Sequence, residues 1–213
     1  MGNVSATVTR VWARMMLVWT VLLATAGCGA SSVSVPAQFP EPIVEKLPLS
    51  IGVVLDGALL AYSHSEELES GKSYNIELGS AQTEMFQKLL SGMFARAAVV
   101  PSTQAPQVDG VLVPSIEELQ FSTPDQTKTD YFEVWIRYQM RLYEPDGTLV
   151  AEWPLTAYGQ SNSRNYNMQG QEPALQAAAL SACRDAMAFF IVQFRTIPAV
   201  ETWLAAKTGG PSA

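Results

Sequence analysis

Side chains that could perform catalysis are sparse and scattered along the 213-residue chain. The single histidine, His64, lies between two serines in a polar stretch, so any histidine-based triad would have to use it. His64 with Glu66 or Glu67 could contact a metal ion, although a solvated turn explains these residues more simply. Glu117 and Glu118 are neighbours, and adjacent strand residues point to opposite faces, which argues against a shared carboxylate site.

Recognisable catalytic and nucleotide-binding motifs are absent from the sequence. It has no nucleophile elbow, no glycine-rich phosphate loop and no Cys or His pair at metal-ligand spacing. The formal charge of −7 disfavours sequence-independent binding to nucleic acid and gives no polybasic means of holding an anionic lipid surface. We therefore expect a non-enzymatic protein with no cofactor, no metal and no nucleic-acid partner.

The thiol of Cys28 is the one group for which the sequence predicts covalent chemistry. Arg10 and Arg14 precede an uncharged apolar run of about a dozen residues, too short for the roughly 20 that span a bilayer. A basic flank, a short apolar segment and small residues form the pattern of a signal peptide, here residues 1–27. Gly27 and Gly29 place the thiol in a flexible segment, where it is open to acylation.

Thr25-Ala26-Gly27-Cys28 resembles the lipobox of bacterial lipoproteins, although that family usually has Leu where this chain has Thr25. The resemblance implies that Cys28 becomes the lipidated N-terminus, carrying palmitate-type chains that hold the protein on a membrane. No Asp follows Cys28, which in that family implies the periplasmic face of the outer membrane. The alternatives are an ordinary secretory signal cleaved near Ala26 or Ala30, or a short anchor helix.

The number of cysteines and the net charge are consistent with a lipid anchor on Cys28. With Cys28 acylated, no disulfide is possible, because Cys183 is the only other cysteine. Cys183 lies among alanines and aromatic residues on a helical pattern, so we expect a buried, inert thiol. Removal of residues 1–27 leaves 11 basic and 20 acidic residues. A covalent anchor is therefore needed to keep this acidic domain on a membrane.

The chain divides into four parts: a signal peptide over 1–27, a lipidated cysteine with a flexible tether over 28–47, one periplasmic domain over 48–206, and a disordered tail over 207–213. The serines and prolines of 29–48 predict the tether. An apolar stripe at helical spacing predicts a helix over 80–96, continued by 97–100 and stopped by Pro101. A second, alanine-rich helix is expected over 173–196, followed by a short helical tail over 199–206.

Strict alternation makes 131–143 the clearest strand, and the Pro-Asp-Gly turn at 145–147 joins it to a return strand over 149–157. Strands are also expected over 49–56, 73–78 and 108–121, with Pro114 at an edge or bulge, and 57–72 is expected to be an exposed excursion. The order β-(β)-α-β-β-β-α predicts an α+β fold in which two helices pack on one face of a mostly antiparallel sheet.

One row of the predicted hairpin is a possible partner-binding surface, because Trp, Tyr and Arg are enriched at interface hot spots. Its members are Trp135, Arg137, Arg141 and Tyr143, with Tyr131 at the start of the row. The alternatives are a row covered by a helix or loop, or a structural cross-strand ladder with Glu152 and Tyr158.

Two other regions contain residues of the types found at contact sites. The polar loop 160–171 suits adaptable contacts or plain solvation, and it contains Asn162, Arg164, Asn165, Tyr166 and Asn167. Trp203 and Leu204 are expected to pack on the domain.

The lipidated Cys28, the helix 80–96, the hairpin 131–157 and the closing helix 173–196 together resemble lipoproteins that accompany envelope lipid transport. The similar groups are the ABC-transporter auxiliary lipoproteins, the lipoprotein that plugs the lipopolysaccharide translocon, and the N-terminal domain of the Tol-system propeller protein. The resemblance implies a non-enzymatic accessory or assembly component with an envelope protein as partner. The alternative is a carrier that binds a lipid or small apolar ligand between helix 80–96 and the sheet.

Overall fold

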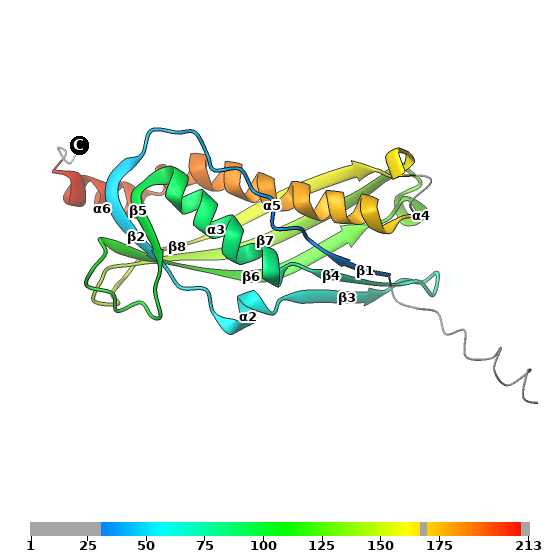
Figure 1. The fold of residues 1–213 in the computed structure, drawn as a ribbon, viewed down its shortest axis with the longest axis horizontal. Coiled ribbons are helices and arrows are strands. Elements are labelled where there is room, and N and C mark those ends of the chain that lie inside the picture. The colour runs from blue at the N-terminus through cyan, green and yellow to red at the C-terminus, as the bar shows by residue number, and fades with distance from the viewer. Residues whose placement is uncertain (1–30, 167–169, 210–213) are drawn as a thin grey trace, which may run out of the picture.

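The computed structural model describes residues 31–166 and 170–209. The predicted signal peptide and Cys28 lie outside the described residues, as do Asn167 and the last four residues of the predicted tail. Two sheets and two long helices form the domain (Figure 1), so the prediction of an α+β fold is confirmed.

The larger sheet has five strands in the order β5-β2-β6-β7-β8. Their bounds are Phe94–Val99, Leu47–Val53, Gly110–Ser122, Tyr131–Tyr143 and Leu149–Asn162. Strand β2 runs parallel to β5 and β6, whereas β6, β7 and β8 are antiparallel neighbours. Pairing of β2 with β6 ends at Leu112, so Pro114 lies where β6 is paired only with β7, which fits the predicted edge position.

The hairpin of β7 and β8 follows the predicted alternation residue by residue. From Phe132 to Leu142, every second side chain of β7 is buried, and the side chains between them are at least partly exposed. At the connecting turn the Gly147 N–H donates to the Glu144 carbonyl at 2.9 Å, and Gly147 adopts a φ of 92°, which favours glycine. The turn, together with a one-residue register shift between Leu142 and Tyr143, sets the register that pairs Trp135 with Tyr158 and Arg141 with Glu152.

Two long helices, α3 (Gly79–Met93) and α5 (Glu172–Phe194), cover the same face of the larger sheet (Figure 1). Phe86 of α3 meets Tyr138 of β7 with ring centroids 6.1 Å apart, and Phe190 of α5 meets Trp153 of β8 at 6.2 Å. By length and composition α5 could also cross a membrane, but here its alanine-rich face is buried against the sheet.

Small residues let α5 approach β8 unusually closely. A Cβ atom placed on Gly159 would lie 2.2 Å from both the Ala178 carbonyl oxygen and the Ala182 nitrogen. The Asp185 carboxylate of α5 also accepts the Tyr158 backbone N–H at 2.9 Å. The helix therefore packs on the inner face of β8 and also satisfies part of its free edge.

The structure differs from the flexible tether predicted over 28–47, because part of this segment belongs to a smaller sheet. This sheet has the order β1-β4-β3, with bounds Ser31–Ser34, Ser73–Glu77 and Ser63–Glu67. Val33, Val35 and Phe39 are buried, and β1 pairs in parallel with β4. A flexible tether is therefore wrong for residues 31–39, because three apolar side chains spaced among the serines and prolines of this segment reach the core.

Three smaller differences concern local elements. Residues 97–100 do not continue the helix, because β5 starts at Phe94 and pairs with β2. The excursion over 57–72 holds the short helix α2 (Gly57–Leu60), β3 and a turn, with Leu59 buried. Helix α6 (Pro198–Thr208) confirms the helical tail but extends into the predicted disordered segment, where Lys207 pairs with Glu144 at 2.9 Å. The remaining elements are α4 (Pro124–Thr127) and the 3₁₀ helix η1 (Ser163–Tyr166).

We predict that Gly159→Ala lowers the free energy of unfolding by roughly 1–3 kcal/mol, because the added methyl group must push α5 away from β8. Urea denaturation followed by circular dichroism measures the change. Gly57→Ala is the matched control, since nothing lies within 4 Å of a Cβ placed there. Equal stability of both variants and the unmodified protein would contradict the close packing of α5.

Candidate functional site

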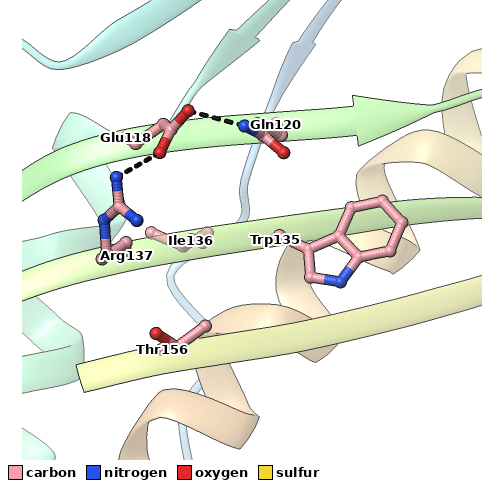
Figure 2. A pocket seen from close by; sticks show the side chains of 6 residues that line it. All are labelled: Glu118, Gln120, Trp135, Ile136, Arg137 and Thr156. Carbon is pink, nitrogen blue, oxygen red and sulfur yellow. Dashed lines mark hydrogen bonds and ion pairs between the residues drawn. The ribbon is translucent and has the colours of Figure 1, made fainter. Parts of the chain in front are cut away.

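The face of the larger sheet opposite α3 and α5 carries a shallow hollow of about 260 Å³ across β6, β7 and β8 (Figure 2). The residues that line it are Glu118, Gln120, Trp135, Ile136, Arg137 and Thr156. Trp135 and Arg137 alternate with buried neighbours on β7, so the strand pleat itself points them to this outer face. The hollow is open to solvent, and its wall combines an indole ring with charged and amide groups.

A bulge in β6 brings two carboxylates to one guanidinium. The pairing of β6 with β7 shifts register between Ile116 and Glu118, and Arg137 then bonds both neighbouring acids. Its Nε lies 3.2 Å from Glu117 Oε2, and its terminal nitrogen donates to Glu118. The expectation that Glu117 and Glu118 serve opposite faces is therefore wrong, because a bulge places an extra residue on one side of the ladder.

Trp135 and Tyr158 form the aromatic part of the same surface, with ring centroids 5.2 Å apart. The Tyr158 hydroxyl donates to Glu133 Oε1 at 2.6 Å. This bond to a carboxylate, reinforced by desolvation and by the negative charge, raises the pKa of Tyr158 to about 12. Tyr158 therefore stays neutral at physiological pH, and its ring packs beside that of Trp135.

Further along the strands, Arg141 Nε donates to Glu152 Oε1 at 2.8 Å. Hydrogen bonding from Gln139, and then from Arg141, lowers the pKa of Glu152. Tyr143 packs instead against a separate apolar cluster at the end of the sheet. The structure thus brings Trp135 and Arg137 together in the hollow, and it places Arg141 and Tyr143 outside it.

The outer face is thus both a cross-strand ladder and an open surface. The ladder alternative is present in the pairs of Arg141 with Glu152 and of Trp135 with Tyr158. The ion pair of Arg141 with Glu152 is exposed and contributes little to stability. Its two charges neutralise each other, and both pairs fix their side chains, which leaves an aromatic and amide surface suited to contact. The sequence did not single out Gln120 or Thr156, because only the strand register places Gln120 opposite Trp135 and Thr156 opposite Arg137.

The other candidates from the sequence lie elsewhere. His64 is on β3, 3.3 Å from a Glu66 oxygen and edge-on to Phe121, at ring centroids 6.0 Å apart. Among the described residues, no three His, Cys, Asp or Glu side chains are grouped so that they could hold a metal ion. In the loop 160–171, Arg164 of η1 pairs with Asp130 at 2.8 Å. Trp203 is buried and Leu204 packs on the core, as predicted.

The apolar stripe of α3 forms ordinary core. Met85, Phe86 and Leu89 are each 1% exposed and belong to the single large cluster that also contains the inner faces of β7 and β8. Cys183 is fully buried beside Tyr138, and burial raises the pKa of its thiol to about 12. The prediction of a buried, inert thiol is confirmed, and the space between α3 and the sheet is filled by side chains.

Comparisons with known proteins give no family for this chain. No protein-family model matches it, and a search of curated proteins finds no relative. Solved structures with a similar arrangement include a DUF330-family protein from Xanthomonas campestris, 12% identical with a TM-score of 0.45, covering 78% of this chain and 95% of that one.

Two others are described as lipoproteins. The minor lipoprotein from Acinetobacter baumannii is 12% identical with a TM-score of 0.40, covering 71% of this chain and 92% of that one. The uncharacterized lipoprotein B from Nitrosomonas europaea is 16% identical with a TM-score of 0.40, covering 78% of this chain and 97% of that one. At these identities and TM-scores, the likenesses do not decide what this chain does.

We predict that Tyr158 ionises near pH 12, seen as the difference in phenolate absorbance between the unmodified protein and Tyr158→Phe. Because the pKa is raised above 10.0, the bond to Glu133 is present at neutral pH and is lost as the pH rises through about 12. Glu133→Gln should move the midpoint back towards 10.0, because it removes the carboxylate charge. The Gln160 side chain contacts the same hydroxyl but carries no charge, so Gln160→Ala should leave the midpoint near 12. A midpoint near 10.0 in the unmodified protein would contradict the bond between Tyr158 and Glu133.

Proposed function

We propose that this chain is a lipid-anchored protein of the bacterial cell envelope, held by acyl chains on Cys28 at the periplasmic face of the outer membrane. Its domain acts as a non-enzymatic accessory or assembly component of a complex of the lipid or lipopolysaccharide transport type. The lipobox-like Thr25-Ala26-Gly27-Cys28 supports the anchor, and the absence of Asp after Cys28 supports the outer membrane. The acidic composition supports it as well, since charge alone would not hold the domain on an anionic surface.

The observation that carries the contact function is the uncovered hollow around Trp135 and Arg137. Trp and Arg side chains contribute much of the binding energy at protein interfaces where they are well packed and shielded from water. Here Tyr158 supports the indole ring, while Glu117 and Glu118 orient the guanidinium. Side chains that are already fixed lose little conformational entropy on binding, so this face needs little rearrangement to accept a partner.

The hydrogen bonding of the carboxylates on this face also favours a contact role. The carboxylates of Glu118, Glu133 and Glu152 are each bonded to a neighbouring side chain on the sheet. A general acid or base needs a free, convergent proton-transfer geometry, and these groups are instead engaged across the strands. We therefore assign this surface to recognition and not to chemistry.

The test is site-specific photocrosslinking of the native lipoprotein in membranes. A photoreactive residue in place of Thr156, on the rim of the hollow, should give an adduct with a larger envelope protein. Trp135→Ala should reduce that adduct at least tenfold, the loss expected for a hot-spot side chain of about 1.4 kcal/mol or more.

Phe189 provides the matched control. It is an exposed aromatic residue on α5, 45% exposed and on the covered side of the sheet, so Phe189→Ala should leave the adduct unchanged. An adduct that is insensitive to Trp135→Ala, or that falls equally in Phe189→Ala, would contradict the assignment of the partner site to the uncovered face.

A further inference from the structure

The starting point of β1 defines one end of the molecule. Ser31 pairs with Tyr74 at the beginning of β4, directly after the turn 68–72 that joins β3 to β4. Lys72 of this turn pairs with Asp125 of α4 at 2.8 Å. The first described residue, the turn and α4 therefore lie together (Figure 1).

The start of the long hairpin belongs to the same end. Tyr131 of β7 pairs with Asn162 of β8, and the Ser163 N–H of η1 donates to the Asp130 carbonyl at 2.8 Å. We call the surface formed by the turn 68–72, α4, residues 128–131 and η1 the anchor end. It is hydrophilic, since Lys72 and Arg164 are both exposed in ion pairs, and its exposed aromatic side chain is that of Tyr131.

The opposite end is formed by the loops 101–109 and 144–148 together with α6. The Ala105 N–H donates to the Pro145 carbonyl at 2.9 Å, and Lys207 of α6 pairs with Glu144. Strand β7 runs from one end to the other with 13 residues. At about 3.3 Å per residue, the two ends are roughly 40 Å apart.

Very little chain separates Cys28 from the fixed part of the domain. Three residues of backbone reach at most about 10 Å even when fully extended, and Ser31 is the third residue after Cys28. Ser31 belongs to a strand that is fixed in the domain, because Val33 and Val35 are buried and the Val35 N–H donates to the Glu77 carbonyl at 3.0 Å. The Gln176 side chain of α5 also donates to the Ser34 carbonyl at 2.7 Å.

We infer that the anchor end rests on the lipid bilayer and that the opposite end points away from it; this rests on the proposed acylation of Cys28. The reach of about 10 Å holds the anchor end at the headgroups, while the opposite end lies roughly 40 Å further out. Exposed charged groups and a tyrosine suit the hydrated interface and not the hydrocarbon. Trp135 is four residues along β7 from Tyr131, about 13 Å into the domain, so the hollow meets partners close to the membrane surface.

The experiment uses the mature lipoprotein in vesicles of phosphatidylethanolamine and phosphatidylglycerol that contain a headgroup spin label. A fluorophore is attached at Ser70→Cys in the turn 68–72 or at Ser102→Cys in the opposite loop; both positions are exposed. Buried Cys183, with its raised thiol pKa, stays unlabelled in the folded protein. Quenching at position 70 should exceed that at position 102 at least threefold.

A flexible insertion of ten Gly and Ser residues between Ala30 and Ser31 is the matched control, and it should reduce the difference between the two positions. Equal quenching at both positions, or stronger quenching at 102, would overturn the orientation while leaving the anchor intact. Protein that carries no acyl chain and does not bind the vesicles would instead overturn the proposed function, and the orientation with it.

Discussion

Close packing of α5 on the β7–β8 hairpin is the interaction on which the rest of the structure depends. It is possible because Gly159 has no side chain and because Ala178 and Ala182 face it across the interface. The same helix satisfies part of the β8 edge through Asp185 and holds β1 through Gln176. One face of the sheet is thereby sealed, and the other is left to polar and aromatic residues.

The sealed face was largely predictable from the sequence. Alternation over 131–143 and the Pro-Asp-Gly turn predicted the hairpin, and the alanine-rich pattern predicted the second long helix. The strand β1 was not predictable, because its serines and nearby prolines are typical of an extended linker. Pairing with β4 and packing against α5, both distant in the sequence, make Val33 a core residue. Pairings between such distant segments leave no local signal.

The open face was predictable in its composition but not in its geometry. The row of Trp135, Arg137, Arg141 and Tyr143 was visible in the sequence, whereas the hollow depends on the bulge before Glu118. That bulge delivers two carboxylates to Arg137, and an unbroken strand would have separated them. Register therefore decides which residues of the neighbouring strands meet Arg137, whereas Tyr143 is separated from Trp135 by its position along β7.

The proposed relation of the hollow to the membrane depends on the short segment between Cys28 and β1 and on the acidic charge of the domain. The proposed acylation of Cys28, three residues before the first strand, would hold this acidic domain with the hollow close to the bilayer. Mass spectrometry of the N-terminal peptide from membrane-extracted protein tests this most directly. The account predicts that the peptide begins at Cys28 and carries acyl chains. An unmodified peptide running through Cys28, or the intact protein free in the medium, would contradict it.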